Sequence, residues 1–207
     1  MAHLVVYKDK LTQNYSQIWN RCNNAGLSLL PVLKEAVVRK ELLDHFFEAG
    51  LSRLGLAHYP VFQNSIPDEI EQVLLYLTPW SDLDSVIRSY GISLQSDLET
   101  LKRLAGAAAH LQKKHKVLLV AEVGDQREGI PVDEIHDVGK QIKERYSSNL
   151  ELAGIAANFA CLSNRLPGKK TFDDLASCMN SMAKCFSVDD PILSVGGSDV
   201  LEWVDNG

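Results

Sequence analysis

Lys34 is the residue whose position points most directly to chemistry. It follows the apolar run Leu29–Leu33, which is typical of a buried strand. A lysine at the end of such a strand is partly removed from water, and this favours the neutral amine that attacks a carbonyl carbon in Schiff-base chemistry. The alternative is an ordinary solvated lysine at a strand end, which the local sequence alone favours.

Two glycine-containing segments could bind an anion. Gly124–Gly129 carries Arg127, whose guanidinium could turn back over a sheet and pair with an anionic oxygen. Its alternative partner is a surface carboxylate, Asp125 or Glu128. The segment Ser194–Ser198 offers backbone N–H groups and two hydroxyls to a phosphate, although glycine pairs also follow strands that bind nothing.

The cysteines indicate neither a metal site nor a disulfide framework, because they form no C-x-x-C pair and no histidine lies at ligand spacing. They are Cys22, Cys161, Cys178 and Cys185. We expect Cys161 and Cys178 to be small core residues, with a catalytic thiol as the weaker alternative. A reducing, cytoplasmic setting fits this pattern best.

Composition limits the possible partners. The 207 residues are 45% hydrophobic, enough for one substantial core. The 21 basic residues are scattered among 27 acidic ones, for a net charge of −6, which argues against nucleic acid or an anionic membrane as a partner. No apolar run reaches about 18 residues, so we expect no membrane span or signal peptide.

Short apolar runs alternate with amphipathic segments along the chain, which indicates repeated βα units and a parallel sheet. This pattern predicts an α/β fold, a TIM-type (β/α) barrel that stops after its seventh strand, in one domain of residues 1–207. An extra strand at Leu4–Tyr7 and a helix over Leu11–Ala25 precede the barrel units of residues 27–207. The predicted barrel strands are Leu29–Leu33, Leu54–Ala57, Val73–Leu77, Ile92–Gln95, Lys116–Val123, Leu152–Ala157 and Ile192–Val195.

In such a barrel the loops after the strands converge over one mouth, where functional groups lie. The residues at these predicted ends are Lys34, Gln95, the Gly124–Gly129 loop with Arg127, Asn158 with Cys161, and Ser194–Ser198.

Six ordered segments carry a resemblance to a known family. They are His3–Leu11, Lys34 at 16 residues before Gly50, Ile92–Thr100, Val123–Ile130, Gly154–Cys161 and Val195–Ser198. In their order and spacing they resemble the racemases dependent on pyridoxal phosphate (PLP), the family that includes the alanine racemases. The ornithine-racemase-like branch is the most similar.

The resemblance implies that PLP is attached to Lys34 and that Arg127 lies near the cofactor's phenolic oxygen. It also implies phosphate contacts from Gly196, Gly197 and Ser198, with Asn158 and Ser194 lining the same mouth, and no metal. The implied reaction is isomerisation of ornithine, another basic amino acid or alanine, with Lys34 as one of two groups that move the α-proton.

The chain also departs from the family, since full-length relatives have an eighth barrel strand and a carboxyl-terminal β-domain beyond the position of Gly207. That domain sends a catalytic tyrosine into the partner subunit's site in alanine racemases. Two alternatives therefore stay open beside a homodimeric racemase or a fragment of one. One is a non-catalytic PLP-binding or homeostasis protein, and the other is a degenerate barrel acting as an interaction subunit whose missing strand comes from a complementing chain.

Overall fold

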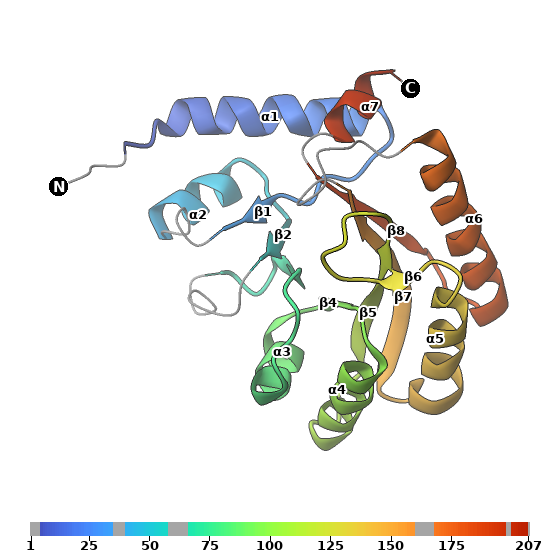
Figure 1. Ribbon diagram of the computed structural model, residues 1–207. Coiled ribbons are helices and arrows are strands. Elements are labelled where there is room, and N and C mark those ends of the chain that lie inside the picture. The colour runs from blue at the N-terminus through green and yellow to red at the C-terminus, as the bar shows by residue number, and fades with distance from the viewer. Residues whose placement is uncertain (1–4, 35–39, 58–65, 160–167, 198–199, 207) are drawn as a thin grey trace.

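The strand segments assemble into one parallel sheet in the computed structural model, which describes residues 5–34, 40–57, 66–159, 168–197 and 200–206 (Figure 1). The strand order is β1-β2-β3-β4-β5-β7-β8, with the short β6 paired to β5. The bounds are β1 Val32–Leu33, β2 Arg53–Leu56, β3 Glu71–Leu74, β4 Ile92–Gln95, β5 His115–Glu122, β6 Ile130–Pro131, β7 Leu150–Asn158 and β8 Ile192–Gly196.

Helices between successive strands cover the outer side of the curved sheet (Figure 1). They are α2 Lys40–Glu48, α3 Leu83–Ser89 after the 3-10 turn Trp80–Asp82, α4 Leu98–His110, α5 Ile135–Gln141 continued by the π-helical turn Ile142–Tyr146, and α6 Lys169–Phe186. The remaining two helices, α1 Lys8–Asn24 and α7 Leu201–Asn206, lie beside each other, and an Arg21 guanidinium nitrogen donates to the Leu201 carbonyl at 3.2 Å.

Side-chain alternation along the strands divides the core into two faces. The outer face packs against the helices through fully buried residues such as Leu54, Leu74, Leu119 and Ile155. The inner face carries a smaller apolar cluster that includes Val73, Ile92, Leu118, Ala153 and Ala156. Residues at the strand ends can therefore be assigned to a face by their register.

The structure confirms the α/β barrel-type fold and the order of the seven predicted strands. The first of them is shorter than predicted, because only Val32 and Leu33 pair with β2 and Val32 is 44% exposed. In the described part of the chain β1 has no second neighbour, and just before Val32 the Pro31 carbonyl accepts a hydrogen bond from the Gly55 N–H of β2 at 2.8 Å.

The extra strand predicted at Leu4–Tyr7 is wrong for the residues that the structure describes there. Val5–Tyr7 lie outside any strand, and the side chains of Val5 and Tyr7 are 67% and 61% exposed. An apolar stretch forms a strand only where a sheet edge receives it, and here the chain enters α1 directly at Lys8. The predicted helix over Leu11–Ala25 is confirmed as part of α1.

Helix α6, with 18 residues, is the longest helix in the described part of the chain, and it is amphipathic. Leu175, Met179 and Met182 are buried on its sheet side, whereas Lys169, Lys170 and Asp173 are exposed. No helix within the described residues combines the length and the apolar character that crossing a bilayer requires.

Candidate active site

The amine of Lys34 belongs to the carboxyl end of β1. Val32 pairs with Gly55, which in turn pairs with the inner-face residue Val73, so Val32 also lies on the inner face. Lys34 follows two residues later and is exposed, so the alternation of β1 places it on the inner side. Lys34 thus directly follows β1, as predicted, but it is exposed and not partly removed from water as the sequence led us to expect, and its role at the mouth stays a prediction.

The ends of β7 and β8 meet on the same face. Asn158 pairs with Gly196, and Ser194 pairs with the inner-face residue Ala156. A Cβ atom added at Gly196 would lie 3.1 Å from Asn158 Oδ1, so any larger residue would crowd this amide. Gly197 follows with a φ of +111°, and its carbonyl accepts a hydrogen bond from the Val200 N–H at 3.1 Å. The two glycines thus leave a turn free of side chains next to Asn158.

The loop after β5 folds back on its own strand. Gly129 has a φ of +149°, and a Cβ atom there would lie 2.5 Å from the Glu122 nitrogen, which only glycine avoids. Ile130 then pairs with Ala121 as the start of β6. The loop is visible in yellow in front of the sheet in Figure 1.

Glu122 fixes the first turn of this loop with its carboxylate. Its Oε1 atom accepts from the Gly124 N–H at 2.5 Å and from the Gln126 N–H at 3.2 Å. Successive backbone N–H groups converging on one oxygen form an anion-binding nest, which here is filled by the chain's own side chain. The loop that carries Arg127 is therefore internally braced.

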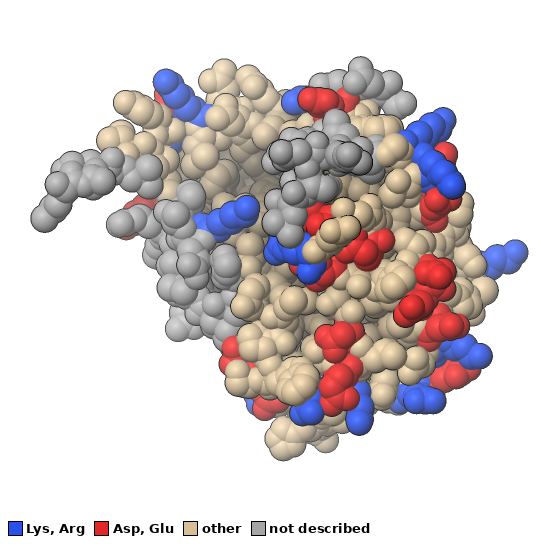
Figure 2. All heavy atoms as spheres, viewed as in Figure 1, with Lys and Arg blue, Asp and Glu red and all other residues tan. Residues whose placement is uncertain are grey.

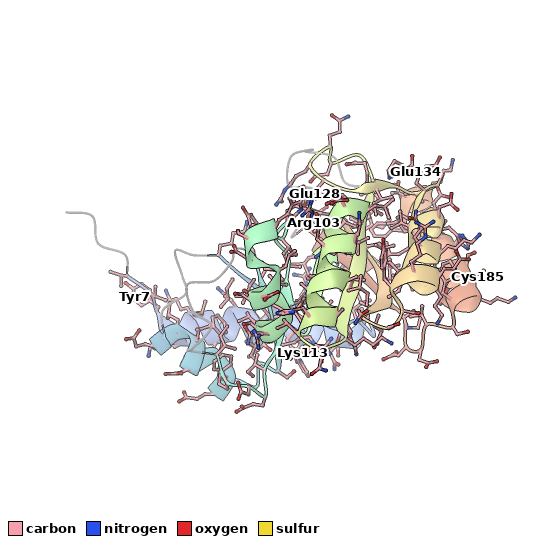
Figure 3. The ribbon with its side chains drawn as sticks, turned by 90° about the horizontal axis from the view of Figure 1, so that it is seen from below. Tyr7, Arg103, Lys113, Glu128, Glu134 and Cys185 are labelled. Atoms are coloured by element: carbon pink, nitrogen blue, oxygen red, sulfur yellow. The ribbon has the colours of Figure 1, made fainter. Side chains whose placement is uncertain are left out.

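Arg127 pairs with Glu128, one of the two alternative partners that the sequence suggested. The guanidinium Nε and a Glu128 carboxylate oxygen are 2.9 Å apart, and the two side chains are 45% and 18% exposed. Figure 3 shows Glu128 and Lys113 at opposite ends of α4, with Glu128 toward the end where the strands finish. Arg127 thus lies beside the mouth while it is held by a neighbouring carboxylate.

Asp125 is a site residue that the sequence interpretation considered only as a partner for Arg127. Its side chain is nearly buried, at 5% exposure, and its Oδ2 atom accepts a hydrogen bond from Asn158 Nδ2 at 2.8 Å. The contact joins the loop after β5 to the end of β7. The one local signal was a carboxylate directly after a turn glycine, and it does not reveal a partner 33 residues away.

Gln95 is the last residue of β4, as predicted, but its buried side chain faces the helices and not the mouth. It pairs with the outer-face residue Leu119, and its Nε2 atom donates to Thr78 Oγ1 at 3.2 Å and to Ser93 Oγ at 2.8 Å. Since this oxygen accepts from Gln95, the Ser93 hydroxyl proton can be donated to Nε2 of His115, 2.9 Å away. Burial, with a smaller effect of Lys113, lowers the pKa of His115 to about 4, so the imidazole is neutral at pH 7.

Of the two cysteines that we expected in the core, the structure describes Cys178. Cys178 is half-buried, its sulfur lies 3.9 Å from the Val132 carbonyl, and burial raises the pKa of its thiol. A thiol with a raised pKa is a poor nucleophile, which fits the core interpretation. Cys161 and Ser198 lie outside the described residues.

Figure 2 shows the face onto which the loop after β5 projects. This face is hollowed above its centre, and basic atoms border the hollow together with acidic ones. Such a mixed border can hold an anionic group and a cationic group at the same time.

Comparison with characterised proteins identifies the relatives of the chain. Ornithine racemase of Acetoanaerobium sticklandii is 26% identical over 200 residues, which cover 96% of this chain and 56% of that protein. Lysine racemase of Thermotoga maritima is 21% identical over 206 residues, which cover 99% of this chain and 57% of that protein. The chain thus spans a little over half the length of these curated relatives.

Solved structures share the fold. PipY of Synechococcus elongatus without PLP has a TM-score of 0.78 at 14% identity, over 95% of this chain and 94% of PipY, and PipY has also been solved with PLP bound. The alanine racemase of Bartonella henselae with covalently bound PLP has a TM-score of 0.72 at 14% identity, over 95% of this chain and 56% of the racemase.

The resemblance inferred from the sequence segments is confirmed by a match over nearly the whole chain. Residues 6–206 match the family described as alanine racemase, N-terminal domain. Proteins of this type bind PLP, as the solved relatives show. The chain therefore belongs to the alanine racemase N-terminal domain family.

Proposed function

We propose that this chain is the PLP-binding barrel domain of an amino-acid racemase and that Lys34 carries the cofactor. The observation that supports this most is geometric. Lys34, Ser194 and Asn158 lie on the inner face, at or near the carboxyl ends of three different strands, where a barrel enzyme keeps its reactive groups.

The groups gathered here suit PLP, which carries an aldehyde and an anionic phosphate. Lys34 supplies an exposed primary amine, and the Gly196–Gly197 turn supplies backbone without side chains, as a phosphate site requires. Arg127 supplies a guanidinium that would exchange Glu128 for an anionic oxygen of the cofactor.

Each residue then has a task in the proposed reaction. When bound, PLP supplies an electron sink that acidifies the α-carbon of an amino acid. The Lys34 amine would take or return the α-proton on one face, while Arg127 would orient an anionic oxygen. Racemisation also needs a second proton carrier on the opposite face. We propose ornithine or lysine as the first substrates to test, because the relatives are named for them.

Trapping tests the cofactor assignment. The purified chain is mixed with PLP, reduced with borohydride and digested, and the modified peptide is identified by mass. We expect the label on Lys34 and none after Lys34→Ala. Lys113→Ala is the matched control, because that lysine lies at the opposite end of α4 (Figure 3) and its variant should label normally. A label that persists in Lys34→Ala would refute the assignment.

The second candidate function is a PLP-binding protein without racemase activity. It is supported by the likeness to PipY, of which this chain covers 94%. Solvent deuterium distinguishes the two candidates, because racemisation exchanges the α-proton of ornithine or lysine with water. Exchange that depends on Lys34 supports the racemase, and a chain that is labelled at Lys34 but exchanges nothing supports the second candidate.

A further inference from the structure

Among the described residues, Asp125 is the most buried acidic side chain around the proposed site. It is 5% exposed, whereas the Arg127 partner Glu128 is 18% exposed. A carboxylate removed from water is costly unless donors satisfy it. The Asn158 amide is such a donor, at 2.8 Å from Nδ2 to Oδ2.

This contact decides which way the Asn158 amide faces. An ionised carboxylate only accepts hydrogen bonds, so it must face the NH2 group of the amide and never its oxygen. Oδ1 is consequently directed to the other side, where it lies 3.1 Å from the position of a Cβ atom at Gly196. Asp125 thus fixes the orientation of an amide that lies against the two-glycine turn.

The same contact also ties two separate parts of the site together. Glu122 braces the loop only against itself, through the N–H groups of Gly124 and Gln126. Asp125 instead joins that loop, which carries Arg127, to the end of β7, whose partner strand β8 ends at Gly196. Loss of the Asp125 carboxylate would free both the amide and the far side of the loop.

We infer that Asp125 is a positioning residue that orients the Asn158 amide and the Arg127 loop for PLP, an inference that rests on the proposed function. In this inference Asp125 acts on PLP through Asn158 and the loop, and not through a contact of its own with the cofactor. This predicts that substitutions at Asp125 and Asn158 are coupled in their effect on PLP binding.

A double-mutant cycle on PLP affinity tests this coupling. PLP is titrated into the wild-type chain, Asp125→Ala, Asn158→Ala and the double variant, and the dissociation constant is measured by absorbance. We expect each single variant to bind PLP about tenfold more weakly than the wild-type chain. The double variant should bind PLP no more weakly than the worse of the two single variants. Asp125→Asn keeps an acceptor and should lose less, and it also serves if Asp125→Ala fails to fold.

Asp97→Ala is the matched control, because Asp97 Oδ1 accepts from the Thr100 N–H at 2.7 Å at the start of α4. It should lower the melting temperature while leaving PLP affinity unchanged. Unchanged affinity in Asp125→Ala, or losses that multiply to about a hundredfold in the double variant, would overturn the inference. A wild-type chain that binds no PLP would instead refute the proposed function, and the inference with it.

Discussion

The two halves of the sheet are built very differently. The half formed by β4, β5, β7 and β8 is centred on two long strands, which pair from His115 opposite Leu150 to Ala121 opposite Ala157. The half formed by β1, β2 and β3 has strands of two to four residues, and its edge residue Val32 is 44% exposed. The long half has a longer ladder, with one register shift between Val117 and Leu118, and a larger buried cluster than the short half, whose own cluster includes Leu54 and Leu74.

The proposed site is divided between these halves. Arg127, Asn158 and Gly196 belong to the long half, whereas Lys34 follows the two-residue strand β1. The difference teaches that Asn158 and Gly196 of the proposed site are positioned by long paired strands, while Lys34 follows a strand with few backbone hydrogen bonds. Substitutions in the long half should therefore cost more stability than equivalent ones in the short half.

A pair of glycine substitutions gives the largest expected contrast. Gly154 on β7 has a φ of +154°, and a Cβ atom there would overlap the backbone carbonyl of Ile192 on β8. Gly55 on β2 would meet only side chains, the nearest being that of Leu75 at 2.8 Å. We expect Gly154→Ala to lower the free energy of unfolding by more than about 4 kcal/mol and Gly55→Ala by about 1–2 kcal/mol. Equal losses in urea unfolding would contradict the comparison.

Truncating one apolar side chain in each half gives the next largest contrast. Leu119 is fully buried on β5, whereas Val32 is half-exposed on β1. We expect Leu119→Ala to cost about 3–4 kcal/mol of unfolding free energy, through lost burial and the cavity left behind. Val32→Ala should cost less than about 1 kcal/mol. The same denaturant titration measures both, and a larger loss for Val32→Ala would show that the β1 edge is covered.

The contrast between the halves also explains what the sequence could predict. A long apolar run such as Lys116–Val123 is typical of a strand buried in a parallel sheet. The strands of the long half and their order were therefore predicted correctly. Leu29–Leu33 and Val5–Tyr7 are equally apolar, but whether they pair depends on a neighbouring strand. Apolarity along the chain does not report the presence of that neighbour.

Site residues were predictable when their role follows from a strand end, and unpredictable when it depends on a remote contact. The positions of Lys34 and Asn158 at strand ends were predicted correctly because apolar runs end there, and their roles stay predictions. The side chain of Gln95 was expected at the solvent-exposed mouth because polar residues at strand ends usually face water. Instead it is buried under the helices, where Ser93 and Thr78 accept its hydrogen bonds. Asp125 was missed because its partner Asn158 lies 33 residues later in the sequence, at the end of another strand.

Acid should destabilise the long half of the sheet through His115. His115 has a folded-state pKa of about 4 against an ordinary value of 6.5, so the unfolded chain binds more protons between these values. Stability should therefore fall as pH is lowered from about 6.5 to about 4, by about 2–3 kcal/mol from this residue, with no further loss below. His115→Gln keeps a neutral partner for Ser93 and should reduce this acid sensitivity in unfolding titrations. An unchanged slope would mean that other groups control it.

The smallest contrast compares one ion pair from each half. Arg127 and Glu128 lie 2.9 Å apart beside the mouth, and Arg53 and Glu71 lie 3.4 Å apart across β2 and β3. Because Arg127, Arg53 and Glu71 are each at least 40% exposed, Glu128→Gln and Glu71→Gln should each cost less than about 1 kcal/mol, and salt should reduce the difference from wild type.

The two substitutions should differ in their effect on PLP binding. Glu128→Gln releases the Arg127 guanidinium for an anionic oxygen, so the dissociation constant for PLP should fall a few-fold, whereas Glu71→Gln should leave it unchanged. Absorbance titration at low and high salt measures both variants. Weaker binding in Glu128→Gln would mean that Glu128 holds Arg127 in its working position, and the loop after β5 would then be preorganised at its tip as well as at Glu122 and Asp125.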